Sequence, residues 1–406
     1  MKIYKVGGAV RDNLLGLPVK DHDWVVVGGS PEAMLELGYK PVGKDFPVFL
    51  HPDTQEEYAL ARTERKTAPG YKGFSFNADP EVTLEQDLQR RDLTINAIAE
   101  DVDGNIIDPF NGRADLEAGL LRHVSPAFVE DPLRVLRVAR FATRFDFRIA
   151  GETLLLMEQI SASGELAALA PERVWQETER ALAETMPVRF FTVLRECQAL
   201  AMIYPEIDNL YGVPQPEKYH PEIDSGLHTM MVLEQACKLS QETTVRFAAL
   251  VHDLGKAATP RQEWPSHKGH EEKGAQLIMQ LCERYRIPNK YRELAVIVAR
   301  HHLDCHRIRE MQPATIVGKL EALDAFRRPD RFEQFLLACE ADARGRTGAE
   351  HQEYLQASYF AACLQAASNI SIRELTEQGL EGRAMAEAIR QSRINAIRDM
   401  QNKSPD

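Results

Sequence analysis

The apolar residues of this chain follow two different spacings, and the change from one to the other falls near Leu121. Before that point, short apolar or alternating runs such as KIYKVG, DWVVVGG, FPVFLH and EEYALAR have the length of β-strands, and glycines close two of them. After it, from SPAFVEDPLRVLRVARFATRF onward, apolar residues recur at the spacing of an α-helix. We therefore expect an α/β domain followed by helices.

Two further boundaries divide the helical part. A segment with three prolines, residues 211–226, is typical of a junction between domains. The chain becomes more polar again from about residue 346. The sequence thus predicts four parts, at residues 1–123, 124–210, 211–345 and 346–406.

The composition argues against several classes of protein. No stretch approaches about 18 consecutive apolar residues, so we expect no membrane span, and the N-terminus lacks the apolar segment of a signal peptide. The six cysteines are widely spaced, without a C-x-x-C pair, which indicates free thiols in a reducing cytoplasm. With a net charge of -12, the chain would bind nucleic acid only through local basic patches.

Two acids, Asp21 and Asp23, stand one residue apart in front of the apolar run WVVVGG. Side chains alternate along a strand, so both acids would project from one face and His22 from the other. Neighbouring carboxylates repel each other unless a cation lies between them, and Mg²⁺ takes oxygen ligands together with substrate phosphates. The pair predicts a Mg²⁺ platform for phosphoryl transfer, although D-x-D also occurs by chance in plain loops.

The segment GGAVRD, at residues 7–12, lies just upstream of these acids. Its two glycines predict a turn that opens a short helix, and backbone N–H groups at such a turn suit a triphosphate. Arg11 suits a phosphate oxygen. A phosphate cradle followed by a carboxylate pair is what nucleotidyl transfer needs.

A third segment, RRDLTINAIA, offers Arg91 for a phosphate and Asp92 for a ribose hydroxyl or for positioning another group. By itself, this stretch is also compatible with the solvated start of a helix.

A fourth segment, EDPLRVLRVARF, predicts a helix with Pro132 in its first turn and Asp131 at its positive end. Three arginines then follow along one side of the helix, at Arg134, Arg137 and Arg140. They repel one another unless Asp131 or an external anion, such as a triphosphate or RNA, offsets them.

These stretches, GGAVRD…DHDW, RRDLTINA, DPFNG…LLRHV and EDPLRVLRVARF, closely resemble in their order the bacterial CCA-adding enzymes, which are tRNA nucleotidyltransferases of the polymerase-β-like superfamily. APERVWQE extends the resemblance into the following helices. It implies a nucleotidyltransferase head at residues 1–123 and a helical neck and body at 124–210 that binds nucleotide and tRNA. The implied reaction is attack of the tRNA 3′-hydroxyl on the α-phosphate of CTP or ATP, with release of pyrophosphate, until CCA has been added without a template.

The resemblance also implies roles for individual residues. Asp21 and Asp23 would bind Mg²⁺ and carry catalysis. The incoming ATP or CTP would be bound by Gly8, Arg11, Arg91, Asp92, Asp131, Arg134, Arg137 and Arg140. Asp131 and Arg134 would read the base, because cytosine and adenine carry an exocyclic amino donor where uracil and guanine present a carbonyl, and an aspartate accepts only from the donor.

Histidines and aspartates gather in the second half of the chain, in ALVHDLGKA, HKGHEEKGA, ARHHLDCH and EADARGR. Imidazoles together with carboxylates suit Mg, Mn, Ni or Fe. The pattern H…HD…D with HDLGK resembles the HD phosphohydrolase superfamily. That resemblance implies a catalytic pair, His252 and Asp253, which binds a metal together with His228 and Asp342. Asp304 competes for the fourth position, and the further candidate ligands are His270, His301 and His302.

A nucleotidyltransferase head followed by an HD domain, here at residues 211–345 with a helical tail at 346–406, resembles the multifunctional CCA proteins. This implies Mg²⁺, Ni²⁺ or Mn²⁺ at the HD site, and phosphatase, 2′-nucleotidase and 2′,3′-cyclic phosphodiesterase activities on RNA ends. Lys256 would meet a substrate phosphate. The implied partners are the tRNA 3′ end, ATP and CTP, without a membrane, while the oligomeric state stays open.

Three alternatives share part of this pattern. A poly(A) polymerase has the same head motifs but usually carries a basic C-terminal extension and no HD domain. A bifunctional alarmone synthetase-hydrolase joins the two kinds of domain in the reverse order. A regulatory RNA-binding protein with decayed sites would lack acids or histidines that are all present here. The loop at residues 61–76 is basic, contains glycine and aromatic residues, and is expected to close over a nucleotide or an RNA end, with a plain surface loop as the alternative.

Overall fold

The computed structural model describes the chain except for residues 20, 43–47, 67–73, 372–379 and 404–406. The centre of the loop that was expected to close over a nucleotide, and the side chains of residues 64–76, lie outside the described residues. The chain forms two compact units. One consists of Met1–Glu184 and Arg189–Ile203, and the other of Thr185–Val188 and Tyr204–Asp406.

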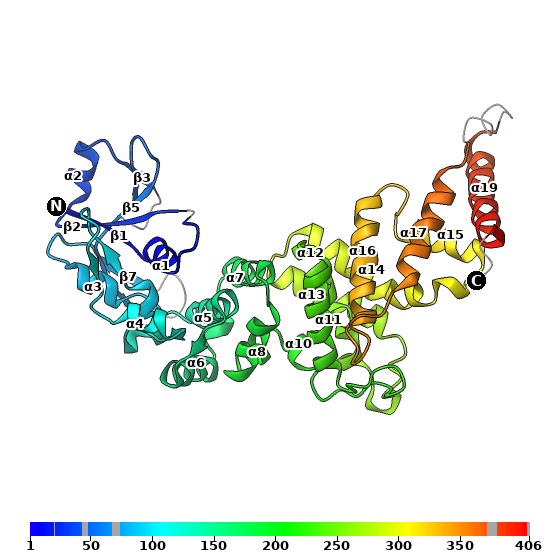
Figure 1. Cartoon of the computed structure of the whole chain (residues 1–406), viewed down its shortest axis with the longest axis horizontal. Helices are drawn as coiled ribbons and strands as arrows, with labels where there is room; N and C mark the ends of the chain where they lie inside the picture. Colours follow the sequence, from blue (N-terminus) through cyan, green and yellow to red (C-terminus); the bar gives the residue numbers. More distant parts are fainter. Residues whose placement is uncertain (20, 43–47, 67–73, 372–379, 404–406) are drawn as a thin grey trace. The chain divides into compact units, whose positions relative to one another are not determined.

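The first unit is built on a seven-stranded mixed sheet with the strand order β3-β4-β5-β2-β1-β8-β9 (Figure 1). Its central pair, β2 and β5, is parallel, and the other pairs are antiparallel. The strands are β1 (Lys2–Val6), β2 (Asp23–Val27), β3 (Lys40–Val42), β4 (Val48–Leu50), β5 (Glu57–Leu60), β8 (Ala99–Glu100) and β9 (Ile106–Ile107). The four predicted strands are therefore confirmed, as β1, β2, β4 and β5.

Successive residues of β2 serve two different hydrophobic cores. Val25 packs with Val6 in one core, and Val26 packs with Tyr58 in the other. This follows from the alternation of side chains between the two faces of a strand. Asp23 lies two residues before Val25 and therefore shares its face.

Helices and two small sheets complete the chain up to residue 203. The helices are α1 (Gly8–Leu14), α2 (Pro31–Glu36), α3 (Leu84–Gln89), α4 (Gly112–Glu117), α5 (Leu133–Phe145), α6 (Gly151–Ser163), α7 (Pro171–Ala183), α8 (Val188–Glu196) and α9 (Ala199–Ile203). The small sheets are the hairpin of β6 (Thr63–Lys66) with β7 (Phe74–Asn77), and the parallel pair of β10 (Leu120–Leu121) with β11 (Arg148–Ile149).

Strand β11 corrects the expectation of helices alone after Leu121. Helix α5 ends at Phe145, the backbone of the next residue, Asp146, is left-handed, and the chain then returns alongside β10. The backbone N–H of Arg148 donates to the carbonyl of Gly119. A strand of two residues is too short to leave an alternating pattern in the sequence.

The second unit is helical, as expected. Its helices are α10 (Pro205–Asp208), α11 (Ser225–Leu239), α12 (Thr243–Val251), α13 (His270–Arg284), α14 (Asn289–His306), α15 (Pro313–Ala322), α16 (Pro329–Arg344), α17 (Leu355–Ser368) and α19 (Gly382–Lys403). Helix α16 packs against α11, α12 and α14, and α13 packs against α14 and the short helix η5 (Leu254–Ala258), so these elements surround one core (Figure 1). Within the described part of the chain, no helix has both the length and the apolar character needed to cross a membrane.

Candidate active sites

The acids of the first unit gather at one end of β2 and β5. Asp23, the first residue of β2, is paired in register with Glu57, the first residue of β5. Directly paired residues project from the same face of a sheet, so the two exposed carboxylates are neighbours. Asp21 precedes the strand and is also exposed. Glu57 was not among the predicted site residues, because only the pairing of the strands brings it beside Asp23.

The opposite face of β2 carries a separate cluster. Glu56 accepts from Trp24 Nε1 at 3.2 Å and lies 2.9 Å from His22 Nδ1. The Trp24 ring stacks on Tyr58, with the ring centroids 5.5 Å apart. His22 is therefore directed away from the face of Asp23, as expected.

A cleft of about 150 Å³ opens beside Asp23 and Glu57, and it is called the head cleft below. It is lined by Val6, Asp23, Trp24, Val25, Val48, Glu57, Ala59, Arg62, Arg90 and Arg91. Carboxylates are suitable ligands for a hard cation, and arginines for phosphate oxygens. The head cleft therefore offers both kinds of group that a nucleoside triphosphate with its cation requires.

The predicted residues Gly8, Arg11 and Arg91 meet at the turn between β1 and α1. Gly7 has a φ of 67°, in the left-handed region, and a Cβ atom there would lie 2.7 Å from Arg91 Nη1. A Cβ atom on Gly8 would lie 3.5 Å from Arg11 Nη2. Glycine is thus required at position 7, where the backbone passes close to a guanidinium group.

A buried chain of hydrogen bonds connects this turn with α5. Arg11 Nη1 donates to Asn96 Oδ1 at 2.5 Å, and Asn96 Nδ2 donates to Asp92 Oδ1 at 2.9 Å. Arg137 Nε then donates to the other oxygen of Asp92 at 2.7 Å. Burial opposes ionisation of Asp92, but Arg137 and Asn96 outweigh it and hold the pKa of this carboxyl well below its usual range. Asp92 is therefore an anion, and its carboxylate positions the Arg137 side chain.

Glu177 on α7 continues this chain. Its carboxylate is buried, accepts from Arg140 Nε, and lies 3.9 Å from Arg137 Nη1. The arginines of α5 were expected to need an anion that offsets their repulsion, and in the structure Asp92 and Glu177 are two such anions. Both Asn96 and Glu177 lie inside segments that were recognised, yet their partners are far away in sequence, so no local pattern indicated their roles.

The two residues expected to read the base lie at the start of α5. Asp131 Oδ1 accepts from the backbone N–H of Leu133 at 3.0 Å, and Asp131 Oδ2 lies 3.2 Å from Arg173 Nη2. Arg134 donates to the backbone carbonyl of Ala127 at 3.0 Å. The helix start predicted at Pro132 is confirmed, and Asp131 is held there by two partners.

In the second unit, six buried side chains form one cluster, called the histidine centre below. They come from five elements or their ends and are His228 (α11), His252 and Asp253 (after α12), His270 (α13), His302 (α14) and Asp342 (α16). His228, His252 and Asp342 offer ligand atoms that lie within 4.8 Å of one another, and so do Asp253, His270 and His302. The four predicted ligands are thus brought together. Neither Asp21 nor Asp23 belongs to such a close set among the described residues.

The imidazole rings are oriented by the backbone of the same unit. The Nδ1 atoms of His228 and His252 lie 3.0 Å from the carbonyl of Gly345 and 2.8 Å from that of Ala249. A carbonyl oxygen only accepts, so each Nδ1 carries a proton, and in the neutral ring each Nε2 presents a lone pair to the centre. Metal-binding histidines are usually held in this way.

Several atoms of the histidine centre have no hydrogen-bond partner among the described residues. They are His252 Nε2, Asp253 Oδ1 and His270 Nε2, and all three are buried. Unpaired buried polar atoms are costly, and a divalent cation would bind lone pairs of these two kinds, on imidazole nitrogen and on carboxylate oxygen. The donor set therefore fits a metal ion.

The charges within the centre shift the pKa values of its members. Burial lowers the pKa of His252, but the Asp253 and Asp342 carboxylates outweigh it and leave that pKa raised. Burial opposes ionisation of Asp342, but His306 and His252 hold its pKa well below the usual range. Burial also lowers the pKa of His302, to about 3, so this ring is neutral and able to bind a metal.

A glycine in HDLGK allows the centre to form. A Cβ atom on Gly255 would lie 1.9 Å from the backbone carbonyl oxygen of His270, so η5 packs directly on the start of α13. Gly274 of α13 faces the same contact, because its own Cβ would lie 3.2 Å from the Gly255 nitrogen. The close approach brings His270 to within 3.3 Å of Asp253.

Asp304 and His301, which were alternative candidates, lie outside the centre. Asp304 Oδ2 accepts from Lys319 Nζ at 2.7 Å and lies 2.9 Å from His301 Nδ1. Successive residues of a helix point about 100° apart, so His301 and His302 cannot both face the core. The structure thus places Asp342, and not Asp304, beside His228 and His252.

Residues around the centre hold its members in place. Asp342 Oδ2 lies 2.6 Å from His306 Nε2. Lys256, expected to meet a substrate phosphate, has its Nζ 2.5 Å from Asp253 Oδ2. Glu222 Oε1 lies 3.0 Å from His228 Nδ1. No role was predicted for His306 or Glu222, because no local sequence pattern indicates their contacts with Asp342 and His228.

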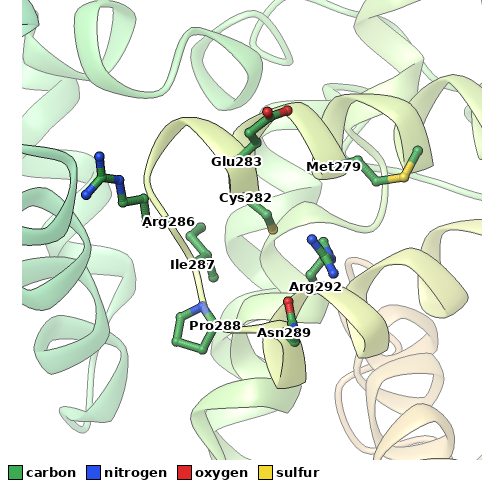
Figure 2. Close-up of a pocket in the computed structure, with 8 residues that line it drawn as sticks. All are labelled: Met279, Cys282, Glu283, Arg286, Ile287, Pro288, Asn289 and Arg292. Atoms are coloured by element: carbon green, nitrogen blue, oxygen red, sulfur yellow. The ribbon is translucent and has the colours of Figure 1, made fainter.

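A larger cavity, of about 700 Å³, lies at the turn between α13 and α14 (Figure 2). Its lining residues are Met279, Cys282, Glu283, Arg286, Ile287, Pro288, Asn289 and Arg292. It contains one carboxylate, no histidine and none of the predicted site residues. We therefore assign it no part in the chemistry.

Family models match three parts of the chain. The model described as the poly A polymerase head domain matches residues 3–122, and the HD domain model matches residues 226–328. Between them, residues 146–211 match a model described as the probable RNA and SrmB-binding site of polymerase A.

Relatives match along almost the whole chain. The multifunctional CCA proteins of Thioalkalivibrio sulfidiphilus and Nitrosococcus oceani are each 62% identical to it, over 403 and 398 residues, with 98% of each chain covered. The multifunctional CCA protein of Hahella chejuensis is 58% identical over 410 residues, which covers 100% of this chain and 97% of the relative.

Solved structures share the fold. The Thermotoga maritima CCA-adding enzyme complexed with tRNA matches with a TM-score of 0.67 at 21% identity, over 100% of this chain and 88% of that chain. A CCA-adding enzyme in complex with ATP matches with a TM-score of 0.66 at 21% identity, over 98% of this chain and 86% of that chain. The predicted fold class, a polymerase-β-like head followed by helices and an HD domain, is confirmed.

Proposed function

The chain belongs to the family of multifunctional CCA proteins: it is a CCA-adding nucleotidyltransferase that carries an HD domain, and we propose that the head cleft and the histidine centre carry its two reactions. The observation that supports this most is that the acids and arginines of separate motifs meet in one cleft, while the histidines and aspartates of other motifs meet in one buried centre. The rival readings as a poly(A) polymerase or an alarmone enzyme lose support, because the relatives match across head and HD domain in this order.

In the head, Asp21 and Asp23 would hold Mg²⁺, with Glu57 as a third carboxylate beside Asp23. A divalent cation bound there neutralises phosphate charge and polarises the reacting phosphorus centre. The chain itself positions the triphosphate: Arg91 lines the cleft, and the backbone at Gly8 lies beside Arg11. The tRNA 3′-hydroxyl then attacks the α-phosphate of CTP or ATP, and pyrophosphate leaves.

Nucleotide selection would be the task of α5. Asp131 would accept from the exocyclic amino group of cytosine or adenine, and Arg134 would donate to the neighbouring ring acceptor. Arg137 and Arg140 would bind the nucleotide from positions that Asp92 and Glu177 hold.

In the HD domain, His228, His252, Asp253 and Asp342 would hold a divalent cation, Mg²⁺, Ni²⁺ or Mn²⁺. Such a cation lowers the pKa of bound water and so supplies a nucleophile for phosphate-ester hydrolysis. The proposed substrates are 2′,3′-cyclic phosphates, 2′-phosphates and other phosphate esters at RNA ends, with the tRNA 3′ end as the shared partner of both sites. We propose action in the cytoplasm, consistent with six cysteines that form no disulfide.

Two single variants test whether the reactions are separate. Asp21→Ala should abolish addition of C and A to a tRNA that lacks its terminus and leave phosphohydrolysis intact, and His252→Ala should do the reverse. Both activities are measured on each purified variant, the first with each nucleotide separately and the second with a 2′,3′-cyclic nucleotide. Unlimited A addition without C incorporation, or loss of both activities in either variant, would contradict the proposal.

A further inference from the structure

Two phenylalanines of α5, Phe141 and Phe145, stand one helical turn apart with their rings stacked. The ring centroids are 5.9 Å apart, and the planes of the two rings differ by 6°. Residues at i and i+4 lie on the same face of a helix, so this arrangement follows from their spacing. Phe141 is buried and Phe145 is half-buried. These two residues are called the phenylalanine pair below.

Three guanidinium groups of the predicted nucleotide site lie over the phenylalanine pair. The Cζ atom of Arg11 is 5.0 Å from the ring centroid of Phe141 and 4.9 Å from that of Phe145. The Cζ atoms of Arg140 and Arg137 are 4.3 Å and 5.6 Å from the centroid of Phe141. A guanidinium group within about 6 Å of a ring centroid is attracted to the electron-rich face of the ring.

A fourth guanidinium group, that of Arg144, lies 5.0 Å from the ring centroid of Phe145. It shares an acid with Arg11, because Asp12 accepts from Arg11 Nε at 2.8 Å and from Arg144 Nη2 at 2.9 Å. The four arginines around the pair thus share three carboxylates, those of Asp12, Asp92 and Glu177. The negative ring faces offset part of the positive charge that these carboxylates leave.

Arg11 shows most clearly what the rings contribute. It is buried, and burial disfavours the charged guanidinium and lowers its pKa, while Asp12 acts in the opposite direction. A guanidinium group has five N–H donors, and Arg11 directs Nε and Nη2 at Asp12 and Nη1 at Asn96. Contact with a ring face takes none of these donors. The pair therefore orients this cation without competing with a phosphate for hydrogen bonds.

The phenylalanine pair also joins two parts of the proposed nucleotide site. Arg11 comes from α1, beside the turn at Gly8, whereas both rings and Arg137 come from α5. The residue expected to read the base, Asp131, lies at the start of α5. The turn that would bind the triphosphate is thus held against the helix that would select the base.

We propose that the phenylalanine pair positions the arginines that bind the triphosphate of CTP and of ATP, namely Arg11, Arg137 and Arg140. Both phenylalanines act through these arginines and are positioning residues. This inference rests on the proposed nucleotide site and adds the groups that orient its cations. Since the base would be read by other residues, CTP and ATP should depend on the pair to the same extent, and discrimination against UTP should not depend on it.

The test weakens the attraction to a ring face while keeping its packing. In the full chain, Phe141 is replaced by phenylalanines with one, two or three fluorine atoms, which withdraw electrons from the ring face in steps and change its size little. Equilibrium dialysis with Mg²⁺ and without tRNA measures the Kd of CTP and of ATP. We expect both Kd values to rise with each fluorine, about 3- to 30-fold across the series, and the ratio of kcat/KM for CTP to that for UTP to stay constant.

The same fluorine series at Phe190 is the matched control. Phe190 is buried in α8, where its ring contacts that of Phe191 at a centroid distance of 5.2 Å. Fluorination there should leave both Kd values within about twofold of the parent. The melting temperature of each protein shows whether it is folded.

The half-buried member of the pair provides a second test that does not disturb the core. Phe145→Leu keeps an apolar side chain but removes the ring face, and it should raise the Kd of both nucleotides about 3- to 30-fold. Phe145→Tyr keeps the ring face and should restore most of the binding. Equally weak binding by the two variants would contradict the proposal.

Two further variants separate this inference from the function on which it rests. Arg137→Gln and Arg140→Gln should each raise the Kd of both nucleotides. If they do so while the Kd stays constant across the Phe141 series, the phenylalanine pair is refuted as a positioning element and the nucleotide site stands. If neither arginine variant changes the Kd, the proposed nucleotide site is overturned and this inference with it. An equal rise in the Phe141 and Phe190 series would also refute the inference.

Discussion

Glu57 lies directly opposite Asp23 on the neighbouring parallel strand, so that two acids from different segments of the sequence face the head cleft together. The adjacent residue Glu56 points to the other side of the sheet, where it binds His22 and Trp24. Two successive glutamates thus have different surroundings, which provides a matched pair for experiment.

Replacing Glu57 should impair nucleotide addition. Glu57→Gln removes a charge beside Asp23 without changing the size of the side chain, and we expect addition of C and of A to slow about 10- to 100-fold, as for other residues that support a metal site. Single-turnover extension of a tRNA without its terminus at several Mg²⁺ concentrations measures this. Glu56→Gln is the control and should keep a rate within about twofold of the parent. Equal effects of the two changes would contradict a role for Glu57 in the cleft.

Breaking the Asp92–Arg137 ion pair should weaken nucleotide binding. Asp92→Asn keeps the shape of the side chain but removes the charge that orients Arg137, and a charged hydrogen bond contributes about 1.5–3 kcal/mol. We expect the KM for both CTP and ATP to rise roughly 10- to 100-fold, with a smaller change in kcat. Asp103→Asn, at an exposed turn of the same unit, is the control. An unchanged KM would show that Arg137 needs no partner to be positioned.

The two aspartates that competed for the fourth position of the HD site should behave differently. Asp342→Asn should lower phosphohydrolysis about 100-fold, because Asp342 lies beside His228 and His252 within the histidine centre. Asp304→Asn should keep most of the activity, because Asp304 binds His301 and Lys319 instead. Hydrolysis of a 2′,3′-cyclic nucleotide by each variant decides between them, and the reverse order of effects would exclude Asp342 as a ligand.

A methyl group at position 255 should disable the HD site while sparing the head. Gly255→Ala would place a Cβ atom against the carbonyl of His270, and overpacking of this kind costs about 1–3 kcal/mol. We expect lower phosphohydrolysis, a lower melting temperature of the HD domain and unchanged CCA addition. Gly318→Ala is the control: this residue lies in α15 with nothing near its Cβ, so alanine should stabilise the helix by about 0.5–1 kcal/mol. Full phosphohydrolysis by Gly255→Ala would show that the close contact is not required.

The sequence indicated most of the elements, because local patterns determine them. The four short apolar or alternating runs before Leu121 correspond to four strands of the sheet, and Pro132 marked the start of α5. The ligands His252 and Asp253 were recognisable since they are adjacent in one motif. The features that were missed depend on contacts between distant segments: β11 pairs across α5 with β10, and Glu57 gains its importance from strand pairing.

In the candidate sites, too, local patterns indicated some residues, while others depend on contacts between distant segments. Each arginine of α5 was visible in the sequence, but its acid was not, since Asp92 and Glu177 reach α5 from other elements. Likewise, a helical pattern could not decide which of His301 and His302 faces inward, or whether Asp304 or Asp342 completes the HD site. Those choices depend on how the helices pack against one another, and the spacing of residues along a single helix does not determine that packing.

The two-sided character of β2 also limits how this gene can change length. Asp23 and Val25 face one side of the sheet, while Trp24 and Val26 face the other. A codon gained or lost inside β2 would exchange the two sides, presenting an indole to the nucleotide and driving a carboxylate into the aromatic cluster. A codon gained or lost between α1 and β2 would leave this alternation intact. We therefore expect natural insertions and deletions in the head to collect in its loops and to avoid residues 23–27.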